Sequence, residues 1–394
     1  MARGRKKWMA AWLGCGFLCG AAVAQDSSDA VWSPTSSMMS AERRGHSMTA
    51  LPNGRVVVIG GVRQQISQTL SSCEIFRPAI NSWGSGGALR LARWEHSASL
   101  LPNGKILVAG GTYWNSKSGG RAEGTAGCEV YDPALRKSAS TGAMVRPRTG
   151  HCAAALPDGR VLVAGGDSKA APPYFSTDCE VYDPATGKWS LTGAMAQGRV
   201  LHRAAALPDG SILVVGGEFV GDALSGCEIF DPASQTWRDA APLNVARAGH
   251  SLTAMSDGRL LACGGYETFR MNGEYGHQRG LASCEVYDPD ADAWTFTGSL
   301  DTPRIMHTAA RLADGRVLVS GGYDLDTTVP GSAYQDFSTS ELYDPTSGAW
   351  SSTASMNGAR FAHLAVSLPS GGALVTCGNN RSTGMAASAE IFDP

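Results

Sequence analysis

One histidine of this chain lies in a setting that suits acid–base chemistry. His277 is the only one of the 8 histidines outside a repeated motif, and its neighbours include Glu274, Tyr275 and Arg279. Imidazole titrates near neutral pH and can act as a general acid or a general base. His277 and the nearby Glu267 are therefore the catalytic candidates, although a histidine in a long loop is also typical of a solvated surface.

Aromatic, acidic and basic side chains gather in the same irregular stretches. An aromatic ring offers an apolar face for stacking, and carboxylate and guanidinium groups offer fixed acceptors and donors, as a sugar ring requires. Long loops also collect polar residues without any function, so both interpretations stand. Beside His277 and Glu267, the expected ligand-binding residues are Tyr113, Trp114, Glu218, Tyr266, Arg270, Tyr323 and Asp324.

The rest of the chain is organised by seven copies of one pattern, which recur every 48 to 57 residues. Each copy opens with Arg-x-x-His and continues through a turn, such as Asn-Gly or Asp-Gly, into a β-branched run that ends in Gly-Gly in six copies. A loop follows, then Glu-(Val/Ile/Leu)-(Tyr/Phe), and four copies carry a Trp six residues past an Asp. The motif histidines are His46, His96, His151, His202, His250, His307 and His363.

These signals predict four short strands per copy, called a, b, c and d, which tight turns join into an antiparallel meander. The expected fold is therefore all-β, a seven-bladed propeller with four antiparallel strands in each blade. The chain stops at Pro394 without a final Trp strand, whereas an unpaired Trp strand stands at Trp32. We expect the N-terminal strand to complete the last blade, so deletion of Val31 to Met38 should destabilise the whole ring.

This meander brings the functional candidates to one face. The a–b and c–d turns share one face, while the b–c loops and the d-to-a crossings share the other, where the Arg-x-x-His segments help to form a mouth. A ring of Arg and His could bind an anion there, but residues that recur in every blade are typical of architecture. Equal numbers of Arg and Glu predict one ion pair per blade between strands a and c, and the histidines are expected to be packing residues.

The Gly-Gly after a β-branched strand, the (Tyr/Phe)-Asp-Pro and the spaced Trp resemble kelch repeats over essentially all of residues 30–394. Two copies depart from this pattern, with Ser138 in place of Trp and Arg77 in place of Asp. The resemblance implies a propeller of the galactose oxidase superfamily, in which Pro303 to His307 is similar to a segment with a Tyr-His copper pair. Here the tyrosine position is Met306, a poor substitute for a phenolate, so we expect no copper-radical site.

Five cysteines occupy one repeated position, immediately before the motif Glu. Equivalent positions in different blades are too far apart to bridge, so these residues are expected to be small buried apolar side chains. One disulfide, between Cys263 and Cys284 of strands b and c, is conceivable. No Cys-x-x-Cys motif occurs, and we expect neither a metal nor a cofactor. The five cysteines are Cys73, Cys128, Cys179, Cys227 and Cys284.

The first residues of the chain predict export. A basic stretch precedes an apolar run from Trp8 to Val23, and Ala22-Val23-Ala24 follows the order of a cleavable secretory signal. This run of about 16 residues is shorter than the roughly 20 that span a bilayer. We therefore expect residues 1–24 to be a signal peptide, residues 25–394 to form a single propeller, and the product to be secreted or periplasmic without membrane insertion.

Composition limits the partners. The 33 basic and 35 acidic residues give a formal charge of -2, which provides no attraction to nucleic acid. The preferred function is a monomeric binding module that captures a saccharide or a protein ligand at the b–c loops. The alternative is an enzyme at the same mouth, either a sugar epimerase or mutarotase or a cyclase or lyase. The chain resembles bacterial sialic-acid mutarotases in repeat type and export.

Overall fold

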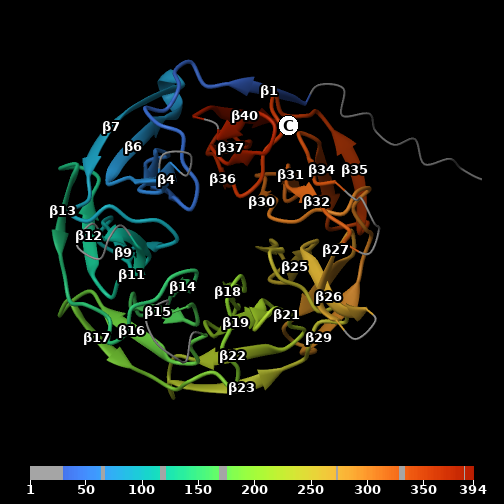
Figure 1. The fold of residues 1–394 in the computed structure, drawn as a ribbon, viewed down its shortest axis with the longest axis horizontal. Helices are drawn as coiled ribbons and strands as arrows, with labels where there is room; N and C mark the ends of the chain where they lie inside the picture. Colours follow the sequence, from blue (N-terminus) through green and yellow to red (C-terminus); the bar gives the residue numbers. More distant parts are fainter. Residues whose placement is uncertain are drawn as a thin grey trace, which may run out of the picture.

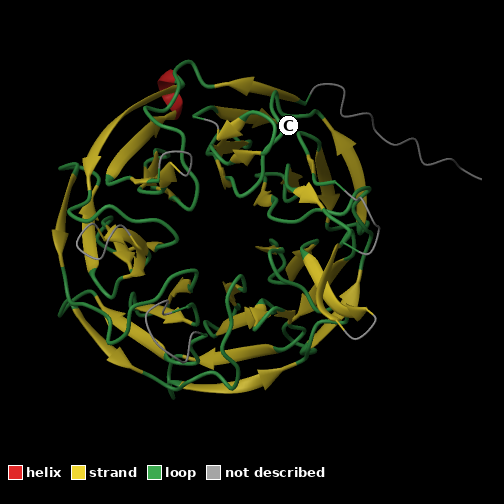
Figure 2. Ribbon diagram, viewed as in Figure 1, coloured by secondary structure: helices red, strands yellow, loops and turns green. Residues whose placement is uncertain are grey.

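The structure is a computed structural model that describes residues 30–63, 67–115, 121–167, 175–271, 274–327, 333–385 and 387–394. Within these ranges strands predominate, and one short 3-10 helix, η2 (Pro78–Ile80), lies among them. The strands are arranged in a ring around an axis (Figure 2). The predicted signal peptide lies outside the described residues, and no described helix is long and apolar enough to cross a membrane.

Each sequence copy forms one antiparallel meander, and we number these units as blades 1 to 7 in chain order. Five of them are separate four-stranded sheets, while blades 1 and 2 are joined in an eight-stranded sheet by a parallel bridge between Lys137 and Ala88. The predicted all-β propeller with antiparallel four-stranded blades is therefore confirmed.

Strands a to d of each blade follow one another from the ring axis outward (Figure 1). The a strands are β2 (Ser47–Ala50), β8 (Ser97–Leu100), β14 (Cys152–Ala155), β18 (Arg203–Ala206), β24 (Ser251–Ala254), β30 (Thr308–Arg311) and β36 (Leu364–Ser367). The b strands are β3 (Val56–Ile59), β9 (Ile106–Ala109), β15 (Val161–Ala164), β19 (Ile212–Val215), β25 (Leu260–Cys263), β31 (Val317–Ser320) and β37 (Ala373–Thr376).

The outer half of each blade is formed by strands c and d. The c strands are β6 (Ser72–Arg77), β12 (Cys128–Asp132), β16 (Cys179–Asp183), β22 (Cys227–Asp231), β28 (Cys284–Asp288), β34 (Ser340–Asp344) and β40 (Ala389–Asp393). The d strands are β7 (Ser82–Ala88), β13 (Lys137–Ser140), β17 (Lys188–Leu191), β23 (Thr236–Ala240), β29 (Ala293–Phe296), β35 (Ala349–Thr353) and, in blade 7, β1 (Val31–Pro34).

Short hairpins fill most of the loops between strands b and c. They stand on the side of the ring that the Arg-x-x-His segments share. The pairs are β4 (Val62–Arg63) with β5 (Gln68–Thr69), β10 (Thr112–Asn115) with β11 (Arg121–Gly124), β20 (Glu218–Phe219) with β21 (Asp222–Ala223), β26 (Tyr266–Met271) with β27 (Glu274–Gly280), β32 (Tyr323–Asp324) with β33 (Gln335–Asp336), and β38 (Asn379–Asn380) with β39 (Gly384–Met385).

The b strands form the core because their residues are apolar and are covered on both faces. A continuous apolar run is what such a strand requires, and all four residues of β3 are completely buried. The apolar clusters lie between neighbouring blades, as where Leu213 and Val215 of blade 4 pack with Leu260 and Ala262 of blade 5. The a strands also contact one another in a closed cycle from β2 through β36 and back to β2. Each blade is therefore stabilised by its neighbours.

The N-terminal strand completes the last blade, as predicted. β1 pairs antiparallel with β40, and the ring of Trp32 lies with its centroid 5.2 Å from that of Phe392. Trp237 and Phe230 of blade 4 make the same contact at the same distance. The indole Nε1 of Trp32 also donates to the carbonyl of Ala354 at 2.9 Å, which ties the closing strand to blade 6.

In every blade the motif Arg and the motif Glu form a buried ion pair, as predicted, but the arginine lies in the d-to-a crossing rather than in strand a. In blade 5, Arg247 Nη2 lies 2.6 Å from Glu285 Oε1, and Nη1 donates to the carbonyl of Gly264 at 2.8 Å. The other oxygen of Glu285 accepts the backbone N–H of Asn244 in the d-to-a crossing at 2.7 Å. The pairs are Arg43–Glu74, Arg93–Glu129, Arg148–Glu180, Arg199–Glu228, Arg247–Glu285, Arg304–Glu341 and Arg360–Glu390.

The motif histidines lie between blades and are uncharged near neutral pH. Six of them are buried, and His151 is partly exposed. Burial, followed by the charge of the motif arginine, lowers the pKa of His307 to about 3. Burial likewise lowers the pKa of His46, His96 and His202 to about 3. The prediction that these histidines are packing residues is therefore confirmed by their burial.

The repeated cysteines are buried free thiols. Burial raises the pKa of Cys73 and Cys179 to about 12 and that of Cys128 to about 11. Cys263 and Cys284 are direct cross-strand partners of β25 and β28, and both are free. The disulfide that the sequence left open is therefore not formed in this structure.

Replacing Trp32 should destabilise the closed ring. Trp32→Ala removes both the contact with Phe392 and the bond to Ala354, and we expect the free energy of unfolding to fall by about 2–3 kcal/mol. Val31→Ala is the matched control because Val31 is on the same strand and 52% exposed; it should change stability by less than about 0.5 kcal/mol. Equal effects of the two substitutions in urea unfolding would contradict the closure role.

The buried histidines should make the protein sensitive to acid. A histidine of the unfolded chain takes up a proton near pH 6.5, whereas the folded pKa of His307 is about 3. The unfolded state therefore binds more protons below pH 6.5, and stability should fall by about 1.4 kcal/mol per pH unit for each such histidine. Urea unfolding at about pH 7.5, 6 and 5 measures this slope, and His307→Gln should lower it by about one proton. An unchanged slope would show that His307 is charged in the folded state.

Candidate ligand-binding mouth

One residue of each blade marks the rim of the mouth. It follows the Gly-Gly pair, or its equivalent in blade 7, and its backbone bridges to the residue after the motif arginine, as Tyr266 does to Ala248. Because this bridge occurs in every blade, the side chains occupy equivalent places around the axis. The rim residues are Val62, Thr112, Asp167, Glu218, Tyr266, Tyr323 and Asn379 in blade order.

The residue before each motif histidine has a left-handed backbone, and we call these seven residues the collar. Five backbone N–H groups of the collar donate to the collar carbonyl of the preceding blade, for example from Met306 to Gly249 at 3.1 Å. Glycine adopts this conformation at little cost, whereas other residues lose roughly 1–2 kcal/mol. The collar is formed by Gly45, Glu95, Gly150, Leu201, Gly249, Met306 and Ala362, with φ between 50° and 61°.

The rims of blades 4 and 5 are joined by a hydrogen bond between two predicted site residues. The hydroxyl of Tyr266 donates to Glu218 Oε2 across the blade boundary. Tyr266 is only 4% exposed, and it packs with Ile305 and Leu325 in an apolar cluster beneath the rim. Burial, followed by the bond to Glu218, raises the pKa of the Tyr266 hydroxyl. Tyr266 is therefore a neutral donor that fixes the position of the Glu218 carboxylate.

Asp324 is a partly buried carboxylate next to the rim of blade 6. Its Oδ1 accepts the backbone N–H of Leu325 at 2.7 Å. The same oxygen lies close to Gly280 of blade 5, since a Cβ atom added to Gly280 would stand only 2.3 Å from it. Burial, together with the charge of Asp326, raises the pKa of Asp324. Among the described residues Asp324 has no ion-pair partner. It can therefore accept a hydrogen bond or exchange a proton with a ligand.

The rim residue of blade 6 takes part in a cluster of aromatic rings around a cation. The guanidinium carbon of Arg381 lies 4.2 Å from the ring centroid of Tyr323, 4.0 Å from that of Tyr334 and 4.3 Å from that of Phe361. Arg381 also pairs with Asp336, which accepts its backbone N–H at 2.7 Å. The face of Tyr323 is therefore occupied by Arg381 rather than free to stack on a ligand.

The candidates of blade 2 form a separate patch on the hairpin of β10 and β11. The hydroxyl of Tyr113 donates to Glu123 at 3.2 Å, and Trp114 is 37% exposed. The ring of Trp114 lies 5.6 Å from that of Trp94, measured between centroids, at 35° between the ring planes. Trp94 directly precedes the collar residue Glu95. This patch offers an exposed ring near the collar, but it is formed by a different blade from the other candidates.

The two catalytic candidates lie on the paired strands β26 and β27 of blade 5. Glu267 binds Arg279 on the neighbouring strand, with Nε donating to Oε1 at 2.9 Å, in a pair that is largely exposed on the arginine side. The backbone of His277 pairs with that of Phe269. The side chains of Arg270 and His277 lie outside the described part of the structure, so their roles stay predictions.

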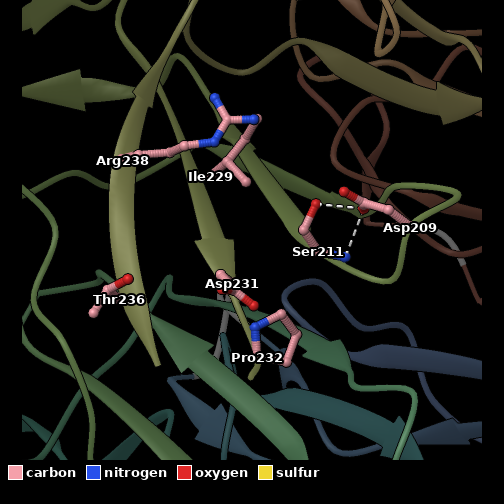
Figure 3. A pocket seen from close by; sticks show the side chains of 7 residues that line it. All are labelled: Asp209, Ser211, Ile229, Asp231, Pro232, Thr236 and Arg238. Carbon is pink, nitrogen blue, oxygen red and sulfur yellow. Dashed lines mark hydrogen bonds between the residues drawn. The ribbon is translucent and has the colours of Figure 1, made fainter. Parts of the chain in front are cut away.

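The collar residues and Arg381 were missed by reasoning from the sequence. The signal for the collar was present, because the position before the motif histidine is Gly in three copies and Glu, Leu, Met or Ala in the others. A groove on the opposite face was also not expected (Figure 3). It contains none of the predicted site residues and is lined by Asp209, Ser211, Ile229, Asp231, Pro232, Thr236 and Arg238.

Comparison with known proteins agrees with the fold. A family model described as the KLHDC2/KLHL20/DRC7 Kelch-repeats domain matches residues 45–265. A fungal alcohol oxidase of the AA5 family, in complex with copper, is similar with a TM-score of 0.72 and 15% identity over 92% of this chain and 76% of that chain. YjhT is similar with a TM-score of 0.60 and 16% identity over 80% of this chain and 99% of that chain. No curated protein sequence matches the chain.

The residues of the mouth do not fit a copper ion. His307 is engaged on both sides, since Nε2 lies 2.8 Å from Ser251 Oγ and Nδ1 lies 3.1 Å from the carbonyl of Arg304. The neighbouring collar residue, Met306, offers a thioether in place of a phenolate. The described residues contain no group of three or more His, Cys, Asp or Glu that could hold a metal.

The collar strain can be tested at its smallest side chain. Ala362→Gly should raise the free energy of unfolding by roughly 0.5–1 kcal/mol, because glycine tolerates the φ of 50° that Ala362 adopts. Ala365→Gly, in strand β36 nearby, should lower it by a similar amount because a strand interior does not need glycine. Urea unfolding of both variants decides the point, and effects of the same sign would contradict a strained collar.

Proposed function

We propose that the mouth of this chain, which belongs to the KLHDC2/KLHL20/DRC7 kelch-repeat family, binds a saccharide at blades 4 to 6. Propeller folds serve binding and enzymatic modules alike, so the function is argued from the residues of the site. The observation that supports this most is the pair of fixed carboxylates, Glu218 on the rim of blade 4 and Asp324 beside the rim of blade 6, with Tyr266 of blade 5 between them in blade order. Sugar hydroxyls are hydrogen-bond donors, and they require acceptors that are held in place.

The two carboxylates differ in a way that suits a ligand with several hydroxyls. Glu218 is held by the Tyr266 hydroxyl and keeps acceptor capacity for a second donor. Asp324 has a raised pKa and no ion-pair partner among the described residues, so a ligand hydroxyl would relieve part of its desolvation. A protein ligand that presents hydroxyl or amide donors would use the same acceptors.

The collar supports a function at the axis. Leu201 and Met306 keep a left-handed backbone where Gly249, between them in blade order, avoids the cost. Strain of this kind is retained where the side chain has a use, and these two side chains are apolar. They contact Tyr266 and Ile305 in one cluster, and we propose that they form the apolar floor beneath the ligand.

A second function, acid–base catalysis at the same mouth, is favoured by the raised pKa of Asp324. A carboxyl group whose pKa is raised toward neutrality can both give and take a proton. In this version His277 would be the second acid–base group, and the reaction would be of the epimerase or mutarotase class, or of the cyclase or lyase class.

We further propose that residues 1–24 direct export, so that a monomeric protein meets its ligand outside the cytoplasm.

The proposal is tested by screening the mature protein against a glycan array and measuring any hit by calorimetry. Tyr266→Phe and Asp324→Asn should each weaken binding by about tenfold or more, because each removes a bond that involves a charged group. Asp209→Asn is the matched control, since Asp209 lies in the groove of the opposite face and should leave the affinity unchanged.

Other outcomes separate the alternatives. Binding that survives His277→Ala together with turnover that does not would establish the enzyme. Absence of any glycan ligand, or equal loss of affinity in Asp209→Asn, would overturn the saccharide proposal.

A further inference from the structure

The residue after the motif histidine makes a repeated contact between blades. In three copies it is a serine at the start of strand a, and its hydroxyl lies at hydrogen-bond distance from Nε2 of the motif histidine in the next blade. Each contact satisfies a polar atom that is otherwise buried between two sheets. The contacts are Ser47 with His96 at 2.9 Å, Ser97 with His151 at 2.9 Å, and Ser251 with His307 at 2.8 Å.

Four copies depart from this pattern, with Cys152, Arg203, Thr308 and Leu364 at this position, and Arg203 of blade 4 is the one charged residue among them. The histidine that would receive the hydroxyl is His250 of blade 5. It is completely buried, and neither of its ring nitrogens has a hydrogen-bond partner within the described ranges, a state that it shares with His202 and His363. The position from which a serine hydroxyl contacts the histidine of the next blade is thus held by an arginine in blade 4.

Arg203 itself is poorly compensated. Its Nη1 donates to the carbonyl of His202 at 3.3 Å, and no carboxylate of the described residues forms an ion pair with it. Arg203 is a partly exposed residue of β18, the inner strand of blade 4, which is bonded to β19 on one edge (Figure 1). Burial lowers the pKa of Arg203, and after burial its charge is the largest influence that lowers the pKa of His250.

Both groups require the same kind of partner. A guanidinium group has only N–H donors, and a neutral imidazole carries one N–H, so neither can satisfy the other fully. A buried charge without a counter-charge is unfavourable, and a water molecule would bond the imidazole without neutralising the arginine. An anion meets both requirements.

We propose that Arg203 and His250 form an anion site on the axial side of blades 4 and 5, with a carboxylate group or a similarly small oxyanion as the ligand. The planar guanidinium fork matches the two oxygens of a carboxylate. One of these oxygens takes the role that the serine hydroxyl has in the other copies, as Ser251 has toward His307. The site does not depend on the ligand that the mouth binds.

Formate is the probe of choice because it is the smallest carboxylate. The melting temperature of the full mature protein is measured against increasing sodium formate, with sodium chloride added to hold the ionic strength constant. We expect a saturable rise for the wild type. Arg203→Ser should abolish this response and, because it restores the serine of the repeat, should not lower the melting temperature without formate. Arg311→Ser, at an exposed position of the inner strand β30, should respond as the wild type does.

The experiment can overturn the proposal in two ways. A wild type that shows no saturable response has no such site, and an Arg203→Ser variant that responds as the wild type does places the anion elsewhere. Arg203→Gln, which keeps most of the side-chain length without the charge, serves in place of Arg203→Ser if the latter does not fold. Isothermal titration of formate into each protein provides the direct measurement.

Discussion

The buried ion pair between the motif Arg and the motif Glu is the contact on which the rest of the molecule depends. Its arginine lies in the d-to-a crossing and its glutamate lies in strand c, so the pair fastens the floor of the mouth to the body of the blade. Arg247 also binds the carbonyl of Gly264, and Glu285 binds the N–H of Asn244, which leaves few polar groups unsatisfied in this buried place. A buried charge that loses its partner is strongly destabilising, and this explains why the pair is repeated without exception.

Around this constant frame, the residues of the mouth are free to differ. The collar and the rim have the same backbone in each blade, yet their side chains change from Gly to Met and from Val to Tyr. The periodic part of the sequence therefore fixes where a side chain stands, and the aperiodic part decides what it does. In blades 4 to 6 the side chains of the rim and the collar combine acidic groups on the rim with apolar groups at the axis. Arg203 follows the same logic, since one changed residue converts a repeated contact between blades into a charged site.

The fold could be predicted from the sequence because each repeated residue has one role that every copy must meet. The unpaired Trp strand at Trp32 was recognised as the closing strand because the last copy of the repeat lacks one. The equal numbers of motif arginines and motif glutamates predicted pairs such as Arg247 with Glu285. The candidate site was predicted less completely. Glu218 and Tyr266 were both chosen, but their contact crosses a blade boundary that no spacing in the sequence reveals. Arg381 was missed because its place between the rings of Tyr323, Tyr334 and Phe361 depends on how loops of two blades meet.

The closing contact of β1 with β40 has a consequence for the timing of folding. Among the described strands β1 is synthesised first, and it pairs with the last one, β40, which follows about 360 residues later. At roughly 5–20 residues per second, its partner is synthesised only after about 20–70 seconds. Until blade 7 is complete, the apolar side of blade 1 that will face it stays uncovered. The stability of the finished ring is thus obtained through a long-lived precursor, and the aggregation risk of this protein is concentrated before the ring closes.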